Sequence, residues 1–210
     1  MDTEPRQTVK PVRILAVSDY AHAYLYDHFD PEKWKDIDLV ISCGDLDSRY
    51  LSFLVTMINA PLYYVRGNHD AHYEERPPEG CEDISGRLVV YKGLRIMGFE
   101  GSPWYNGRGV QLTEWQMWWR VRKMRRHLRR HKGVDIVVTH APPAGVHEDD
   151  DHVHRGFKVF RDLIRDYSPR YFLHGHTRIT YLNRDRLSVV DETQVVNVTG
   201  YYVLEVPPLN

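Results

Sequence analysis

Five apolar segments of the chain each end in a polar turn that carries aspartate, asparagine or histidine. Short, continuous apolar runs of this kind are typical of strands buried in a sheet. The turns that follow them are Ser18-Asp19, Ser42-Cys43-Gly44-Asp45, Gly67-Asn68-His69-Asp70, His140-Ala141-Pro142-Pro143 and His174-Gly175-His176-Thr177-Arg178. In open α/β sheets, ligands bind beyond the carboxyl ends of the strands. We therefore expect the five turns to gather at one site.

The side chains in these turns have the chemistry of a metal site. They offer oxygen and imidazole ligands, whereas Cys43 falls in the buried part of its strand. Such a donor set without a thiolate favours divalent Mn, Fe, Zn or Co. The structural alternative is that each side chain caps its own turn, which would not explain why all of them follow strands.

The order of these motifs resembles that of the calcineurin-like metallophosphoesterases. In that superfamily Asp-x-His is followed by Gly-Asp, Gly-Asn-His-Asp/Glu, a histidine at a strand end, and Gly-His-x-His. The resemblance extends from Asp19 to Arg178, and it is specific because all five motifs occur in order, each after an apolar run. Two positions depart from the pattern, since Ala21 and Arg178 stand where the family has histidines.

The resemblance implies two divalent ions and assigns ligands to both. Asp45 would bridge the ions, and Asn68, His140 and His176 would complete one of the two sites. Asp19 would belong to the other site, which lacks two family ligands in this chain. We therefore expect one or two ions per chain, identified only as Mn, Fe, Zn or Co.

The substituted positions leave several interpretations open. Arg178 cannot bind a cation, because a guanidinium is permanently charged. It could neutralise Asp19 and Asp45 in place of a metal, hold a substrate phosphate through paired hydrogen bonds, or face the solvent. A shift in the first turn could bring His22 to the metal, although a surface histidine at a helix start is the simpler interpretation.

The resemblance also places His69 near the leaving group of the reaction. Asp70 would orient His69 and keep it protonated near neutral pH, as a general acid requires. The alternative is that the two residues only order their loop.

A second candidate for substrate binding lies after His140. His154 and Arg155 directly precede a helix that we expect to begin at Gly156, and helix N-termini favour anions. The run from His147 to His154 contains metal-ligand residue types, but its irregular spacing favours a solvated loop.

Hydrophobic periodicity outlines the remaining elements. We expect strands at 13–17, 38–42, 62–65, 87–91, 94–98, 135–139, 171–173, 179–183, 187–190, 194–198 and 201–206. We expect helices at 24–29, 49–59, 113–132 and 156–167, and an exposed loop at 72–86. The first of these helices should stop at Pro31, and the third should bury Met117, Val121, Met124 and Leu128.

Early alternation of strands and helices followed by a run of strands implies a two-sheet core with helices outside. The resemblance likewise implies an α/β fold, a four-layer α/β/β/α sandwich of two mixed sheets flanked by helices. We predict a single domain at residues 11–210 after a flexible N-terminal tail at residues 1–10.

Composition limits the class of protein. With 42% hydrophobic and 27% charged residues, the chain has an ordinary globular composition. Its net charge of -1 gives no general attraction to nucleic acid or to a membrane, and no apolar stretch approaches the ~18 residues of a membrane span. Two cysteines form no disulfide framework, which favours a cytoplasmic protein with reduced thiols.

The helix at 113–132 carries eight lysines and arginines between Arg120 and Lys132, and three tryptophans near its start. A solvated basic face, with tryptophans that pack or join copies into a homo-oligomer, is the common reason for such a pattern. Nucleic acid stays open as a weaker alternative partner.

The resemblance to the calcineurin-like metallophosphoesterases implies metal-dependent hydrolysis of a phosphate ester by metal-activated water. The substrate would be a small or nucleotide-like phosphodiester or phosphomonoester. The alternative is a scaffold or binding protein that has kept the fold and lost one metal site.

Overall fold

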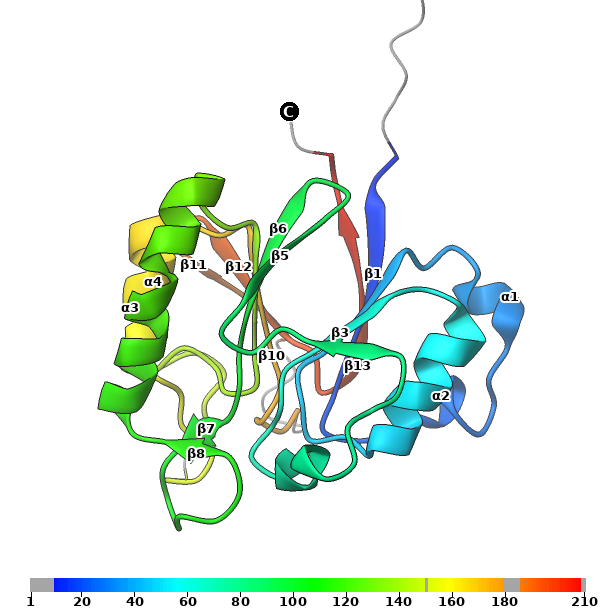
Figure 1. The fold of residues 1–210 in the computed structure, drawn as a ribbon, viewed down its shortest axis with the longest axis horizontal. Coiled ribbons are helices and arrows are strands. Elements are labelled where there is room, and N and C mark those ends of the chain that lie inside the picture. The colour runs from blue at the N-terminus through cyan, green and yellow to red at the C-terminus, as the bar shows by residue number, and fades with distance from the viewer. Residues whose placement is uncertain (1–9, 150, 180–185, 209–210) are drawn as a thin grey trace, which may run out of the picture.

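Two mixed β-sheets pack face to face, and helices cover the outer side of each sheet (Figure 1). The structure is a computed structural model that describes residues 10–149, 151–179 and 186–208. The arrangement confirms the predicted four-layer α/β/β/α sandwich. Among the described residues, no helix combines the length and the apolar character that a membrane crossing requires.

The first sheet has the strand order β13-β1-β2-β3-β4. Strands β1 to β4 run parallel to one another, and β13 pairs antiparallel with β1. Their bounds are β1 Val12–Ser18, β2 Leu39–Ser42, β3 Leu62–Tyr64, β4 Cys81–Asp83 and β13 Gly200–Val206. The helical segments on this side are η1 Ala23–Leu25, α1 Pro31–Trp34, α2 Ser48–Ile58 and η2 Asp70–Glu74.

The second sheet has the order β11-β12-β10-β9-β6-β5, with antiparallel pairs at both edges and parallel pairs between them. Its strands are β5 Leu88–Tyr91, β6 Leu94–Phe99, β9 Ile136–Thr139, β10 Tyr171–His174, β11 Leu187–Val190 and β12 Thr193–Asn197. Helices α3 Glu114–His131 and α4 Lys158–Tyr167 cover this sheet. A small ladder joins β7 Ser102–Pro103 to β8 Gln111–Leu112.

Alternation along the strands divides the apolar side chains among three layers of core. In β1, Ile14 and Ala16 pack between the two sheets, whereas Leu15 and Val17 pack beneath α2. In β9, Val137 packs beneath α3 and α4. Because both faces of these strands are buried, their sequences are continuous apolar runs rather than alternating ones.

The long helix α3 follows its sequence signals closely. Thr113 and Gln116 form the expected capping box, and the helix closes at Lys132 in the left-handed conformation. The predicted inward face is confirmed, since Met117, Val121, Met124 and Leu128 are its buried residues.

Two predicted elements were wrong. Pro31 begins α1 instead of ending a helix, because proline fits the first helical turn and Asp30 caps it. The segment 72–86 is not a simple loop, since it contains β4, which extends the first sheet beside β3. Three partly buried residues in β4 give too weak a pattern to reveal a strand.

Two further predictions fall largely outside the described residues. They are the tail at residues 1–10, of which Lys10 is described, and the strand at 179–183, of which Ile179 is described.

A buried ion pair fastens α3 to the second sheet. Three N–H groups of Arg95 on β6 donate to the Asp135 carboxylate over 2.7–2.8 Å. The guanidinium also donates to the carbonyl groups of His131 and Lys132 at the end of α3. Burial opposes ionisation of Asp135, but the contacts with Arg95 lower the pKa of this carboxyl.

Arg95→Ala should lower the free energy of unfolding by about 2–4 kcal/mol, because it removes the guanidinium from the buried Asp135 carboxylate and leaves only the backbone N–H donating to it. Since the folded-state pKa of Asp135 is lowered, this contribution is present above the ordinary aspartate pKa and is lost as the pH falls below it. Urea denaturation near neutral pH and again near about pH 3 measures both effects.

The exposed pair of Arg165 and Asp162 on α4 provides the control. Arg165→Ala should change the free energy of unfolding by less than about 0.5 kcal/mol. Equal losses in the two variants would contradict a special role for Arg95.

Candidate metal centre

The polar turns after β1, β2, β3, β9 and β10 meet at one edge of the sandwich, the lower edge in Figure 1. Backbone hydrogen bonds join neighbouring turns, from Asp19 N–H to the Gly44 carbonyl and from Gly175 N–H to the His140 carbonyl, both 3.0 Å. A pocket of about 440 Å³ opens there, and its lining includes Asp19, Asp45, Asn68, His69 and His176.

The buried ring of His140 is the centre of this arrangement. Its Nδ1–H donates to the Cys43 carbonyl over 2.8 Å, which directs Nε2 into the site. Around Nε2 lie Asn68 Oδ1 at 2.9 Å, His176 Nδ1 at 3.1 Å and Asp45 Oδ2 at 3.2 Å. Four atoms with lone pairs from four different turns therefore converge on one point.

Contacts outside the cluster fix the orientation of two other members. The Nε2–H of His176 donates to the Val153 carbonyl over 2.9 Å, so its Nδ1 lone pair faces His140. The Asn68 amide donates through Nδ2 to the Tyr105 hydroxyl over 3.2 Å, so its oxygen faces the site. Carbonyl partners of this kind hold metal-binding histidines in the required tautomer.

The donor set fits a divalent cation. Lone pairs repel one another at these distances unless a proton or a cation lies between them, and one proton can satisfy at most two of the four atoms. Two imidazoles, one carboxylate and one amide oxygen also leave coordination positions open for water and substrate. The residues that would hold the ion are Asp45, Asn68, His140 and His176.

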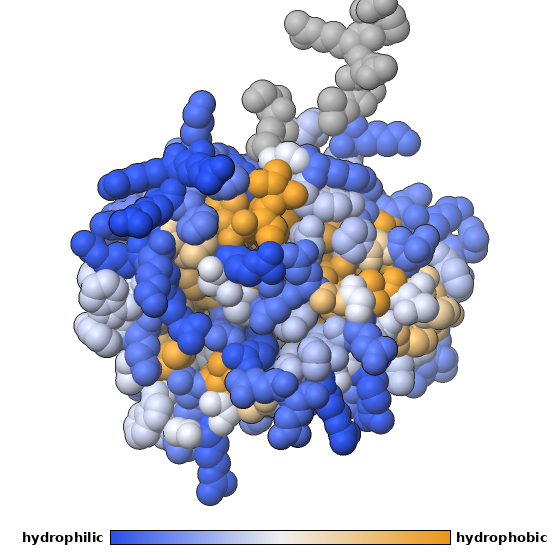
Figure 2. Space-filling model, in the orientation of Figure 1, coloured by the Kyte–Doolittle hydropathy of each residue, from blue (hydrophilic) through white to orange (hydrophobic). Residues whose placement is uncertain are grey.

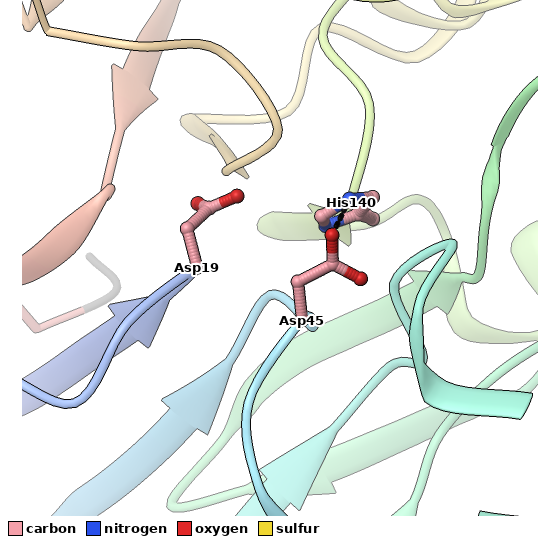
Figure 3. A group of neighbouring side chains, drawn as sticks. All are labelled: Asp19, Asp45 and His140. Atoms are coloured by element: carbon pink, nitrogen blue, oxygen red, sulfur yellow. Dashed lines mark ion pairs between the residues drawn. The ribbon is translucent and has the colours of Figure 1, made fainter. Parts of the chain in front are cut away.

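Asp19 lies beside this cluster. It enters from the end of β1, opposite Asp45 and His140, and ligand atoms of the three residues lie within 4.8 Å of one another (Figure 3). The Asp19 carboxylate accepts hydrogen bonds from the His176 backbone N–H at 3.0 Å and the Thr199 hydroxyl at 3.1 Å. Asp19 and Asp45 are the two carboxylates that would hold a second ion.

Electrostatics couple the buried groups. Burial opposes charge on both Asp45 and His140, but their mutual attraction prevails, so the pKa of Asp45 is lowered to about 2 and that of His140 is raised to about 9. Burial and the neighbouring His140 charge lower the pKa of His176 to about 3. Burial raises the pKa of Asp19, against the attraction of His140.

Several site residues have a backbone conformation that is uncommon outside glycine. The φ angles are 70° at Asp19, 57° at Asp45 and 67° at His176. Each of these residues turns the chain sharply just after a strand. Strained positions of this kind cluster at functional sites, where the surrounding structure enforces them.

The turns after β2 and β3 interlock through Asp70. Its carboxylate accepts hydrogen bonds from the backbone N–H groups of Asp45 at 2.7 Å and Gly67 at 2.8 Å. The turns approach so closely that a Cβ on Gly44 would lie 2.2 Å from the Gly67 nitrogen. A side chain at either glycine would force the two turns apart.

These contacts correct the role expected for Asp70. Its carboxylate serves the backbone of the two turns, and among the described residues no hydrogen bond joins it to the His69 ring. The ring of His69 is 75% exposed at the pocket mouth, with Nε2 3.9 Å from Asp45 Oδ2. Asp45, rather than Asp70, is therefore the acidic neighbour of His69.

The two substituted family positions are both exposed. Arg178 lines the pocket, and in the described part of the chain no ion pair joins it to Asp19 or Asp45. Its backbone N–H donates to Asp149. His22 caps η1 and packs edge-on against Tyr201, with ring centroids 4.7 Å apart.

The helix N-terminus expected to bind substrate is already occupied. Glu114 at the start of α3 accepts hydrogen bonds from the Lys158 and Val159 N–H groups at the start of α4, which begins two residues later than predicted. His154 lines the pocket, whereas Arg155 is exposed and is not among the lining residues.

Two histidines in the loop before α4 form more contacts with the rest of the protein than the expected solvated loop would. His147 Nδ1 lies 2.9 Å from the buried His174 Nε2, and His147 Nε2 lies 2.8 Å from Ser188 Oγ. His154 contacts Asp151 at 2.7 Å, and its ring packs against His176.

The sequence did not point to three groups that complete the site. They are Tyr105, which fixes the Asn68 amide, Thr199, which donates to Asp19, and the Val153 carbonyl, which fixes His176. Only Tyr105 had a signal, since it lies in a glycine-rich loop that could border a site.

Comparisons with known proteins identify the family of the chain. A family model for calcineurin-like phosphoesterases matches residues 13–178. Metallophosphoesterase domain-containing protein 1 from Homo sapiens is 25% identical, over 69% of this chain and 54% of that protein, and the Mus musculus protein gives the same values. The chain thus spans about half the length of these curated relatives.

Among solved structures, TT1561 of Thermus thermophilus matches with a TM-score of 0.59 and 16% identity, covering 93% of this chain and 94% of that one. This likeness supports the fold alone. The region matched by the family model also contains all five polar turns, from Asp19 to Arg178. The chain is therefore a member of the calcineurin-like phosphoesterase family, whose activity is metal-dependent hydrolysis of phosphate esters.

Proposed function

We propose that this protein hydrolyses a phosphate ester, a phosphodiester or a phosphomonoester, with one tightly held divalent ion, which would be Mn, Fe, Zn or Co. Asp45, Asn68, His140 and His176 would hold the ion. The convergence of their lone pairs around His140 Nε2 is the observation that carries the proposal.

When bound, a divalent cation supplies positive charge for the phosphoryl oxygens and makes water more acidic. The residues around it have separate tasks. Asp70 holds the turns of Asp45 and Asn68 together, and His69 is placed at the open mouth, where it can donate a proton to the leaving oxygen. Arg178, on the pocket rim, can donate paired hydrogen bonds to a phosphate.

The pocket supports a small or nucleotide-like substrate. Tyr20 and Tyr105 line it together with the metal-site residues, and their rings offer flat apolar surfaces beside the phosphate position. A volume of about 440 Å³ suits a small ligand rather than a polymer.

The second metal position is weaker in this proposal. Asp19 and Asp45 alone would hold an ion there, because Ala21 and Arg178 supply no ligand. The positive charge of Arg178 at the pocket also disfavours a second cation. We expect about one tightly bound ion per chain.

The same substitutions favour a second candidate function, a scaffold or binding protein with a weakened site. The retention of a complete four-residue ligand set opposes it, because a scaffold has no need of converging lone pairs. The activity measurements below distinguish the two functions.

His140→Ala should reduce metal affinity at least about 100-fold and abolish hydrolysis of bis(p-nitrophenyl) phosphate, because it removes the ligand on which the others converge. Metal analysis after dialysis, together with the hydrolysis rate, measures both. His127→Ala, an exposed histidine of α3, is the matched control and should resemble wild type. Unchanged metal content in His140→Ala would refute the site.

Metal binding should release about one proton near neutral pH. The pKa of His140 is raised to about 9, so its proton must leave, whereas Asp45 and His176 have pKa values of about 2 and 3 and bind no proton there. Affinity should therefore fall about tenfold per pH unit below about pH 9.

Calorimetric titration with Mn in two buffers of different ionisation enthalpy gives this proton count and the stoichiometry. A second equally tight ion, or binding without proton release, would contradict the arrangement proposed here.

His69→Ala should slow hydrolysis of an alkyl phosphodiester by about 10²–10⁴-fold but hydrolysis of a nitrophenyl ester far less, because only a poor leaving group needs the proton. His28→Ala, an exposed histidine that does not line the pocket, is the control. Steady-state kinetics on the two substrates separate the roles, and equal losses on both would leave His69 with positioning alone.

A further inference from the structure

The outer side of α3 presents tryptophans and cations together. The buried residues of α3 are Met117, Val121, Met124 and Leu128. Residues about half a helical turn away from these positions therefore point outward. Trp115 and Trp119 occupy the outward side of the first turns, and Arg122, Arg126 and Arg130 continue it. We name these five residues the outward face of α3.

The tryptophans of this region are unusually exposed. Trp115 is 67% exposed, Trp119 41% and the adjacent Trp118 38%. They pack edge-on against one another, with ring planes at 81°. Single exposed apolar residues are ordinary on a protein surface, but a cluster of large ones marks a binding surface.

Most lysines and arginines of α3 form no ion pair with an acidic side chain of the described residues. Among the residues that the structure describes, the only ion pair formed by α3 joins Arg120 to Glu100. Nearby acids are engaged elsewhere, since Glu114 caps α4, and Asp162 and Asp166 pair with Arg165. Figure 2 shows a strongly hydrophilic surface over α3, in agreement with this excess of exposed charge.

We propose that the outward face of α3 docks on an anionic phospholipid surface. The helix is about 27 Å long by its rise per residue, and its cations lie along the side opposite its buried residues. Tryptophan suits the boundary between headgroups and acyl chains because its ring is apolar and its N–H is polar. Arginine and lysine beside it gain from the negative surface potential.

Two other binding partners, a second copy of the chain and a single-stranded nucleic acid, fit the outward face of α3 less well. A symmetric contact between two copies would bring the basic faces together, which like charges disfavour. A single-stranded nucleic acid needs open ring faces for stacking, whereas these rings pack edge-on and Arg122 covers Trp118 at 4.9 Å.

The docking surface lies outside the metal centre, so its test does not depend on catalysis. The full chain is sedimented with vesicles of phosphatidylcholine and with vesicles of an equimolar mixture of phosphatidylcholine and phosphatidylglycerol. Binding should occur only to the mixed vesicles, shift tryptophan emission to shorter wavelength, and weaken as sodium chloride is added.

Arg126→Glu with Arg130→Glu should reduce binding to the mixed vesicles at least about tenfold by reversing two charges. Trp115→Ala with Trp119→Ala should reduce binding and remove the emission shift. Lys33→Glu with Lys35→Glu, in α1 and at its C-cap on the opposite flank (Figure 1), should change binding less than about twofold. Circular dichroism and phosphodiester hydrolysis, unchanged in all three, would show that the variants fold.

Several results would overturn the proposal. They are an absence of vesicle binding, equal binding to both vesicle types, or equal losses in the α1 and α3 charge variants. Tighter binding of a single-stranded RNA that requires Arg126 and Arg130 would assign the face to nucleic acid. Dimers in sedimentation velocity that the tryptophan variant dissociates would assign it to a second copy.

Discussion

The hydrogen bonds accepted by Asp70 are the interaction on which the candidate metal centre depends. One buried carboxylate holds the backbone of Asp45 and Gly67, so two turns from neighbouring strands act as one rigid unit. The close approach of Gly44 and Gly67 makes this contact sterically feasible. Precision of about half an ångström is what a metal site requires from its scaffold, and here backbone contacts provide it.

The other half of the centre comes from the second sheet. His140 and His176 follow β9 and β10, yet they meet Asp45 and Asn68 from the first sheet within hydrogen-bond distance. The hydrogen bond from the His176 backbone N–H to the Asp19 carboxylate joins the two sheets at the same place. The centre therefore exists only when the inter-sheet core is packed, so its integrity reports on the whole sandwich.

The sequence sufficed to predict what depends on periodicity and motif order. Buried strands, the capped helix α3 and the meeting of five turns at one edge all follow from local patterns that the sandwich preserves. It did not reveal β4, whose three residues have no distinct pattern, or the carboxylate of Glu114 at the start of α4. The sequence also did not reveal the hydrogen-bond partners of Asp70. Contacts between a side chain and the backbone of two turns produce no pattern in sequence spacing.

The left-handed backbone conformation of three residues in the centre affects which substitutions the site can accept. Glycine would adopt the conformation of Asp19, Asp45 and His176 without the roughly 1 kcal/mol that a side chain costs at each position. Glycine would also lose the hydrogen bonds that the carboxylates of Asp19 and Asp45 accept and the one that the His176 ring donates, so contacts within the site offset this conformational cost. All three persist here together, although two other family ligands have gone. The contacts of these side chains within the site, rather than local backbone preference, hold the three residues in the left-handed conformation.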